Sequence, residues 1–358
     1  MTAAALRTRE SYADLALYAP DRRACAIDLS DNTNLWGMPP AAGRALHEAS
    51  AAAVTRYPEV YAQSLKLALA EYAGVDPSCV VTGCGSDDVL DSAIRAFGEP
   101  GDRIAIPDPS FAMIPAFARM NALEPVLVPL TNGYDVDADG MLASDSGITY
   151  LCSPNNPTGT PFSRGSIERI VAGARGVVII DEAYAEFARR SMVGLAQESD
   201  RVLIARTMSK AFGLAGLRIG YAVGHPALVA EVEKSRGPYK INGLAERAAL
   251  AALGSDMDWV RGRIADAIEL RAAFVDALQG LGLDPLPSRA NFVLVPVANA
   301  GAVAGSLRSR GVAVRPFEAL RAPAGTPLAA TGGDALRITI GPWPMLEQAL
   351  GALREVLP

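Results

Sequence analysis

Lys210 is the side chain in this sequence that most clearly points to chemistry. It lies in Ser209-Lys-Ala-Phe-Gly-Leu-Ala-Gly-Leu-Arg218, a glycine-punctuated stretch after the apolar run 202–205. An amine kept among small and apolar residues forms a Schiff base with a carbonyl when its pKa is perturbed, which an arginine cannot do. A buried structural lysine is the alternative. Of the 33 lysines and arginines, the lysines are only Lys66, Lys210, Lys234 and Lys240.

A carboxylate and an amide follow two other apolar runs. Asp181 comes directly after Val177-Val-Ile-Ile180, which is typical of a buried strand, and Asn156 follows the strand-like run 148–152. We therefore expect the carboxylate of Asp181 at a buried strand end, with a helix N-cap as the alternative. For the neighbouring amide of Asn155, a turn role is the ordinary interpretation.

A candidate anion site lies at Gly85-Ser86-Asp87, which opens a predicted helix. The free N–H groups of a first helical turn and the Ser86 hydroxyl bind anions such as phosphate. From these residues alone, a plain N-cap is equally consistent.

Composition limits the classes of function. The chain has 358 residues and a formal charge of −6 with no basic cluster, which argues against a nucleic-acid partner. His47 and His225 are the only histidines, so a Ser-His-Asp triad or a metal site is not expected. The start of the chain lacks an apolar signal-peptide core, and no apolar run approaches a membrane span. No membrane partner is therefore expected. The four cysteines lack paired spacing, which favours free thiols in a reducing cytoplasm.

Short apolar runs alternate with helical patterns through the first two thirds of the chain. Strand-like runs at 79–82 and 103–106 precede helices expected at 86–97 and 111–121, and a helix at 166–174 separates the next two strands. Continuous apolar strands between helices predict a parallel sheet covered on both faces. Ligands of such sheets bind beyond the carboxyl ends of the strands, where Asp181, Asn156 and Ser86 all fall.

The pattern changes after about residue 244. Helices continue to about residue 281, and strands are expected at 291–295, 312–314 and 336–340 around a helix at 303–310. Glycines and prolines within 321–333 predict a loop. This mixture predicts a second, smaller α+β domain.

The ordered set of segments resembles the class I/II pyridoxal-phosphate-dependent aminotransferases and is most similar to the histidinol-phosphate aminotransferases. The resemblance runs from about residue 28 to 341 and includes Ser153–Gly159, Asp181-Glu-Ala-Tyr184, the Lys210 segment, Arg56-Tyr-Pro-Glu59, Ile94-Arg-Ala-Phe97, Pro238-Tyr239 and Leu336–Gly341. It implies an α/β fold of fold type I: a large cofactor-binding domain at 35–244, with a mainly parallel seven-stranded sheet between helices. A smaller α+β domain would comprise 1–34, with the N-terminal arm, and 245–358.

The resemblance also implies roles for individual side chains. Lys210 would hold pyridoxal 5′-phosphate as a Schiff base, and Asp181 would keep the ring nitrogen protonated so that the ring accepts carbanion electrons. Tyr184 and Asn156 match donors to the phenolic oxygen of the cofactor. Phe111 matches the side chain stacked on the ring, with core packing as the alternative. The matched phosphate ligands are Ser86, Asp87, Thr207, Ser209 and Arg218.

Tyr57 matches a tyrosine that reaches the cofactor phosphate of the neighbouring subunit, which implies a homodimer with shared active sites. Arg337 matches the arginine that binds the substrate α-carboxylate bidentately, with a solvated arginine as the alternative. Arg315, Tyr18 and Asn34 are further candidates for substrate binding.

The substrate-reading segments depart from the family. Asn32-Thr-Asn34-Leu replaces the usual N-E-N-P, and Pro238-Tyr-Lys240-Ile-Asn242 replaces P-Y-N-x-N. Lys240 either binds a phosphate or is solvated, while Arg22 and Arg23 are cations expected near the pocket mouth.

Taken together, the resemblance predicts transamination of histidinol phosphate with 2-oxoglutarate, giving imidazole-acetol phosphate and glutamate. An aromatic or other amino-acid aminotransferase and a threonine-phosphate decarboxylase-like lyase are alternatives within the fold. A non-enzymatic regulatory module that binds the cofactor is the alternative from another class.

Overall fold

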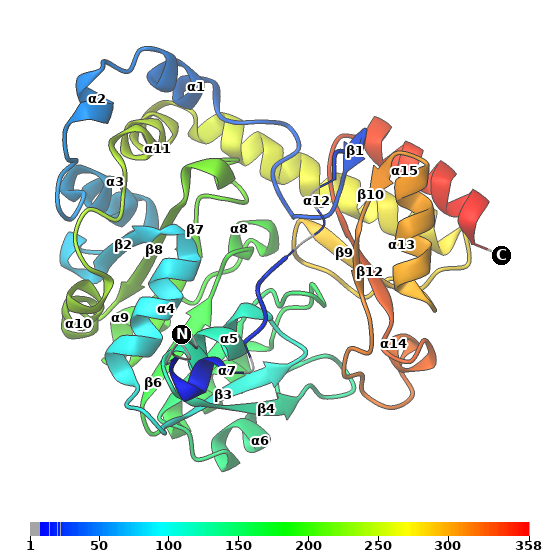
Figure 1. Cartoon of the computed structure of the whole chain (residues 1–358), viewed down its shortest axis with the longest axis horizontal. Coiled ribbons are helices and arrows are strands. Elements are labelled where there is room, and N and C mark those ends of the chain that lie inside the picture. The colour runs from blue at the N-terminus through cyan, green and yellow to red at the C-terminus, as the bar shows by residue number, and fades with distance from the viewer. Residues whose placement is uncertain (1–7, 14, 20, 22, 358) are drawn as a thin grey trace, which may run out of the picture.

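The structure is a computed structural model that describes residues 8–13, 15–19, 21 and 23–357. Arg22, a candidate cation near the pocket mouth, lies outside the described residues. So do the first seven residues, part of the segment on which the signal-peptide expectation rests. Figure 1 shows a large sheet with its helices beside a smaller group of strands and helices.

The larger part is built on a seven-stranded sheet, as predicted. Six strands are parallel, and β8 runs antiparallel to both of its neighbours. The central strands are rich in Val, Ile and Leu and are buried along their whole length, as expected for a sheet covered on both faces. Their spatial order is β2 (Val80–Cys84), β8 (Ile219–Gly224), β7 (Val202–Thr207), β6 (Val177–Asp181), β5 (Ile148–Cys152), β3 (Arg103–Asp108) and β4 (Glu124–Pro129).

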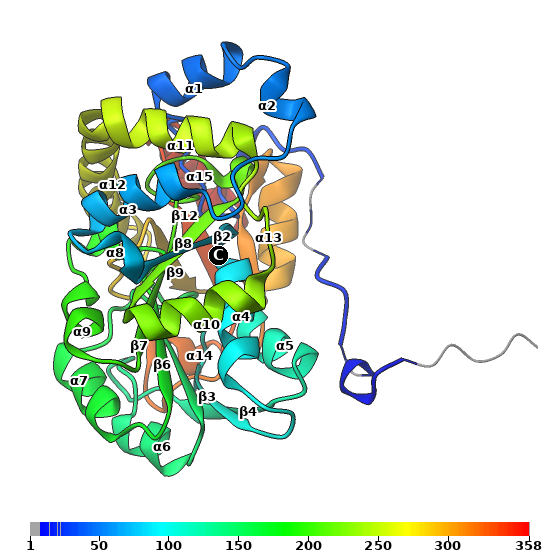
Figure 2. The ribbon, with the colours of Figure 1, turned by 90° about the vertical axis from the view of Figure 1, so that its left-hand side faces the viewer.

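Two apolar cores flank this sheet. Ile179 packs in one core, whereas Val178 and Ile180 pack in the other, because successive strand side chains point to opposite faces. Figure 2 shows helices on both sides of the strands. One core is covered by α4 (Gly85–Phe97), α5 (Met113–Met120) and α10 (Pro226–Arg236), and the other by α3 (Gln63–Ala73), α6 (Ala138–Ala143), α7 (Arg164–Gly173) and α9 (Val193–Glu198).

The smaller part contains an antiparallel sheet in the order β11 (Arg315–Phe317), β12 (Ala335–Thr339), β9 (Phe292–Pro296). Beside it, β1 (Ile27–Asp28) pairs in parallel with β10 (Val312–Ala313), which brings the segment before residue 34 to this part. The exact division at residues 34 and 244 remains a prediction. The helices of this region are α12 (Met257–Gln279), α13 (Ala300–Ser309), α14 (Pro327–Ala330) and α15 (Trp343–Val356).

The remaining elements join these two parts. Figure 1 shows α12 running from α11 (Gly243–Ser255) to the smaller sheet, with α1 (Pro40–His47) beside α11. In the described part of the chain, no helix is both long and apolar enough to cross a membrane. The short elements are α2 (Ala52–Thr55), α8 (Ala185–Ala188), η1 (Glu10–Tyr12), η2 (Pro77–Cys79) and η3 (Ala215–Leu217).

Candidate active site

A cavity of about 590 Å³ lies where the large sheet meets the smaller one. Cys152, Asp181 and Thr207, the last residues of three adjacent parallel strands, line one side of it. Arg315 and Arg337, from β11 and β12, line the other side. The topology therefore brings strand ends of the large sheet to a face of the smaller one, as expected for ligand sites in open α/β sheets.

Lys210 projects into this cavity from the loop after β7. Its Nζ donates to the backbone oxygen of Asp31 at 3.0 Å and lies 6.0 Å from the centre of the Tyr184 ring. Burial, and secondarily the charge of Arg337, lower the pKa of Lys210 to about 8. At pH 7 about a tenth of the amine is therefore neutral, far more than for a lysine at the ordinary value of 10.5, and a neutral amine is the nucleophilic form.

Asp181 presents a buried carboxylate at the end of β6. The Tyr150 hydroxyl donates to its Oδ2 at 2.9 Å, and the Ala183 N–H donates to its Oδ1 at 3.0 Å. Burial raises the pKa of Asp181 to about 6, although both hydrogen bonds oppose the shift. The N-cap of α8 is Tyr184, so the N-cap alternative for Asp181 is wrong.

Tyr184 is held by an amide that the sequence did not single out. Asn32 Nδ2 donates to the Tyr184 hydroxyl oxygen at 3.1 Å, and Asn32 Oδ1 accepts from Thr339 at 3.3 Å. Because the Tyr184 oxygen already accepts this bond, its own O–H is available to the cavity. Asn34, the amide expected from the same segment, donates to Ala211 O instead and does not line the cavity.

The start of α4 and the loop between β7 and β8 form one wall of the cavity, called the anion wall here because it carries the candidate phosphate ligands. Ser86 and Asp87 line the cavity, and no side chain caps the N-terminus of α4. Gly85 has φ +83°, and a Cβ there would lie 2.2 Å from Arg218 Nη2. Only glycine therefore lets this guanidinium approach the first turn. Thr207 and Ser209 add hydroxyls to the same wall.

Arg337 and Arg315 are paired residues of β12 and β11, so their side chains lie side by side. Arg337 is only 7% exposed, and the solvated alternative is therefore wrong. It donates to Asn156 Oδ1 at 2.6 Å and to Ser30 O at 2.8 Å, while its Nε has no partner within the described chain. Arg315 forms an ion pair with Asp31 at 2.9 Å.

Comparison with known proteins agrees with this geometry. A family model described as aminotransferase class I and II matches residues 25–353. The chain belongs to the class I and II aminotransferases. A histidinol-phosphate aminotransferase from Methylibium petroleiphilum is 40% identical, covering 86% of this chain and 82% of its own length. An aromatic amino acid aminotransferase from Corynebacterium glutamicum (strain ATCC 13032) is 35% identical, with coverage of 94% and 98%.

The fold of this aminotransferase also matches solved structures. A histidinol-phosphate aminotransferase from Sinorhizobium meliloti, in complex with pyridoxal-5′-phosphate, superposes with a TM-score of 0.86. The alignment covers 99% of this chain and 98% of that one at 24% sequence identity. At this identity, the likeness shows the fold alone.

Several residues that the sequence suggested for the active site lie outside the cavity. Lys240 does not line the cavity: it forms an ion pair with Asp88 at 2.7 Å, and its side chain is 31% exposed. Arg23 pairs with Asp21 and does not line the cavity. Tyr57 is 84% exposed and stacks on Tyr239 with ring centres 4.9 Å apart, away from the cavity of its own chain.

The remaining candidates do line the cavity. Tyr18 reaches it from the N-terminal arm, although its side chain is mostly exposed. Phe111 lines it and also packs against the core, so cavity and core roles coincide. Asn155 is buried, and its Nδ2 donates to Pro109 O and Thr158 Oγ1, in keeping with a turn role. The described residues contain no group of three or more His, Cys, Asp or Glu placed to hold a metal ion.

Proposed function

We propose that the chain is a pyridoxal 5′-phosphate-dependent aminotransferase whose amino donor is histidinol phosphate and whose acceptor is 2-oxoglutarate. The observation that carries the proposal is one cavity containing the Lys210 amine, the Asp181 carboxylate and two separate groups of cations. The family match and the 40% identical histidinol-phosphate aminotransferase support the reaction and the substrate.

The chemistry of the donor set fits the cofactor. Lys210 would hold it covalently through Nζ, and Asp181 would accept a hydrogen bond from the protonated ring nitrogen. Phe111 would stack on the ring, while Tyr184 and Asn156 would donate to its phenolic oxygen. When bound, pyridoxal phosphate supplies a carbonyl for the amino group and a ring that takes up the electrons left at the substrate carbon. The ligands of its phosphate would be Ser86, Asp87, Thr207, Ser209 and Arg218.

Lys210 would also move the proton that transamination requires. With a pKa of about 8, its Nζ can accept a proton from the substrate carbon and release it again near neutral pH. Its hydrogen bond to Asp31 O supports a fixed direction for this transfer. No histidine lines the cavity, so Lys210 is the base best placed among the described residues.

The donor's anionic end would bind between the two paired arginines. Four cations line the cavity in the described structure, and Lys210 and Arg218 are assigned to the cofactor. Arg315 and Arg337 remain for the phosphate of histidinol phosphate or for the carboxylate of the acceptor. Because Arg23 and Lys240 lie elsewhere, the structure gives no support to a phosphate site built from those two cations.

An aromatic amino-acid aminotransferase is the second candidate. The C. glutamicum relative supports it because the alignment covers 98% of that protein. The Arg315–Asp31 ion pair also supports it, because the carboxylate offsets one of the two cations available to a dianion.

A half-reaction screen tests the proposal. Holoenzyme is mixed with histidinol phosphate, phenylalanine, tyrosine or threonine phosphate, and the loss of the visible cofactor band gives kcat/KM for each. We expect histidinol phosphate to be the best donor. A tenfold preference for phenylalanine or tyrosine would select the second candidate. Release of carbon dioxide from threonine phosphate without a keto acid would reject transamination.

We also propose a homodimer that shares its active sites and works in the cytoplasm. The exposure of Tyr57, and its stacking on Tyr239 outside the cavity, support a role toward a second subunit. All four cysteines are free thiols, which supports a reducing compartment.

A further inference from the structure

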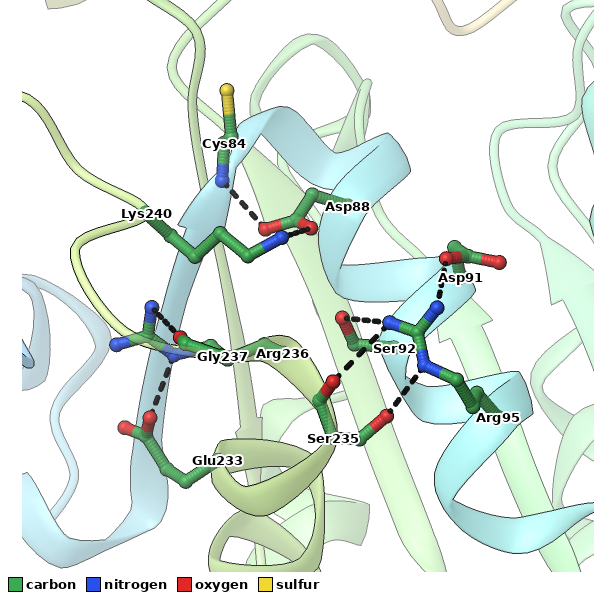
Figure 3. A network of polar contacts seen from close by, with 10 residues as sticks. All are labelled: Cys84, Asp88, Asp91, Ser92, Arg95, Glu233, Ser235, Arg236, Gly237 and Lys240. Atoms are coloured by element: carbon green, nitrogen blue, oxygen red, sulfur yellow. Dashed lines mark hydrogen bonds and ion pairs between the residues drawn. The ribbon is translucent and has the colours of Figure 1, made fainter.

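Lys240 departs from the family pattern, and its side chain reaches the first turn of α4. Its Nζ pairs with Asp88 Oδ1 at 2.7 Å, and Asp88 Oδ2 accepts from the Cys84 N–H at 2.9 Å. Figure 3 shows the two donors approaching different oxygens of one carboxylate. The Asp88 carboxylate therefore accepts from the backbone just before α4 and at the same time binds a cation from the segment before α11.

This carboxylate poses an electrostatic problem for an anion site. Asp87 and Asp88 both lie in the first turn of α4, where the helix dipole favours negative charge. The same turn is where a phosphate dianion would bind, and a nearby carboxylate repels a dianion. Asp87 lies 3.4 Å from Arg218, so its charge is partly offset. Lys240 supplies the corresponding cation for Asp88.

Both partners of the Lys240–Asp88 pair are fixed in place. A Cβ at Gly83 would lie 2.9 Å from Asp88 Oδ2, so the carboxylate packs closely against the end of β2. On the other side, the Tyr239 N–H donates to Val60 O at 3.2 Å, which anchors the segment that carries Lys240. The Asp88 side chain is only 14% exposed, so water screens its charge incompletely.

We propose that Lys240 is a positioning residue that neutralises Asp88 and so allows the N-terminus of α4 to accept a dianion. It does so without lining the cavity. The proposal rests on the proposed function, which places the cofactor phosphate at this helix. It assigns Lys240 neither to a substrate phosphate nor to solvent.

Binding of pyridoxal phosphate and of pyridoxal to the cofactor-free enzyme tests this role, because only the first ligand carries the dianion. For Lys240→Met, we expect the Kd of pyridoxal phosphate to rise about three- to tenfold at low salt, with little change for pyridoxal. Lys240→Arg keeps the charge and should bind both ligands like the unaltered enzyme. The difference should shrink in 1 M salt, where the Debye length is about 3 Å.

The double variant Lys240→Met/Asp88→Asn gives the sharpest result. The amide oxygen introduced by Asp88→Asn can still accept from the Cys84 N–H, and no uncompensated charge remains. Pyridoxal phosphate affinity should therefore recover to within about twofold of the original. Lys234→Met is the matched control, because Lys234 pairs with Glu231 on the exposed face of α10. This control should change neither Kd.

Three results would overturn the inference: unchanged pyridoxal phosphate affinity in Lys240→Met, equal weakening of both ligands, or no recovery in the double variant. The last two would indicate a structural tie between α4 and the segment before α11. If the unaltered enzyme binds neither ligand, the proposed function itself fails, and this inference fails with it.

Discussion

Lys210 differs from the other lysines in what its amine contacts. Lys66, Lys234 and Lys240 each pair with a carboxylate, whereas Lys210 donates its hydrogen bond to a backbone oxygen. Borohydride should therefore fix the cofactor on Lys210, and Lys210→Ala should bind cofactor noncovalently without transaminating. Peptide mapping of the reduced enzyme checks this, and a label on Lys240 would reject the assignment.

Asp181 should matter more for turnover than for cofactor affinity. Its carboxylate is set at the strand end by Tyr150 and Ala183, facing the cavity. In Asp181→Asn the neutral amide cannot hold a ring nitrogen protonated, so we expect kcat to fall by roughly 10²-fold or more, with a much smaller change in cofactor Kd. Steady-state kinetics and cofactor titration measure the two effects separately. Near-normal turnover would contradict the proposed role.

The same carboxylate predicts a pH effect on the cofactor-free protein. The folded pKa of Asp181, about 6, lies above its ordinary value of 3.8, because burial penalises the charged form. Its contribution to stability is therefore fully present below pH 3.8 and is lost as the pH rises through about 6. Relative to Asp181→Asn, the unaltered protein should lose up to roughly 3 kcal/mol of unfolding free energy between about pH 4 and pH 7. Urea unfolding of both proteins across this range checks the sign, and parallel curves would refute it.

At the scale of elements, the anion wall depends on the close approach of β8 to the start of α4. A Cβ at Gly220 would lie 2.2 Å from both the backbone carbon of Gly85 and the nitrogen of Ser86. Because backbone atoms cannot rotate away, Gly220→Ala should lower stability by about 1–3 kcal/mol and weaken cofactor binding.

Gly254→Ala is a useful comparison for this prediction. Gly254 lies in α11, and a Cβ there would have no neighbouring atom within 4 Å. Alanine at this position should therefore be neutral or stabilise by about 0.5–1 kcal/mol. Thermal unfolding and cofactor titration of both variants measure the contrast. Equal behaviour of the two would show that the β8–α4 contact is not tight.

The elements are more predictable from the sequence than the contacts between them. The apolar runs correctly indicate β2, β3, β5, β6 and β7, because a strand buried on both faces has a strong local signal. They do not indicate β4 and β8. The loop expected at 321–333 contains α14, a single short turn of helix that the glycines and prolines obscure.

Failures at the site arise from contacts distant in sequence. The alternation around Arg337 left a solvated side chain open as the alternative to substrate binding, and it is Asn156, 181 positions earlier, that contacts the guanidinium and helps to bury it. The choice of Asn34 over Asn32 fails for a similar reason, because the backbone of Asn32 turns through φ +56° and aims its amide at Tyr184. Tyr150 was not predicted, although a tyrosine in a fully buried strand beside the Asp181 strand is an available signal.

At the scale of the whole molecule, an exposed aromatic surface lies outside the cavity. Tyr57 and Tyr239 stack there, and Tyr61 lies under the guanidinium of Arg236 at 5.3 Å. Large exposed apolar side chains gathered in one region are typical of protein–protein contacts. This surface adjoins the segment that carries Lys240, so a second subunit bound there would lie near the α4 anion wall.

Mixing Lys210→Ala chains, which we expect to be inactive, with Tyr57→Phe chains, which we expect to be impaired, tests whether a second subunit completes the site. Lys210→Ala removes the amine from its own cavity, whereas Tyr57→Phe removes a hydroxyl that we propose acts in the partner's cavity. In a heterodimer of the two, one site carries both lesions and the other carries neither. The intact site should therefore restore activity that approaches the activity of one unaltered site.

Differently tagged chains, purified as the heterodimer, allow the activity per site to be measured. Lys210→Ala mixed with Lys234→Met chains is the control, because Lys234 pairs with Glu231 on an exposed helix face and should leave its own sites active. A proven Lys210→Ala/Tyr57→Phe heterodimer without recovery would show that each chain completes its own site.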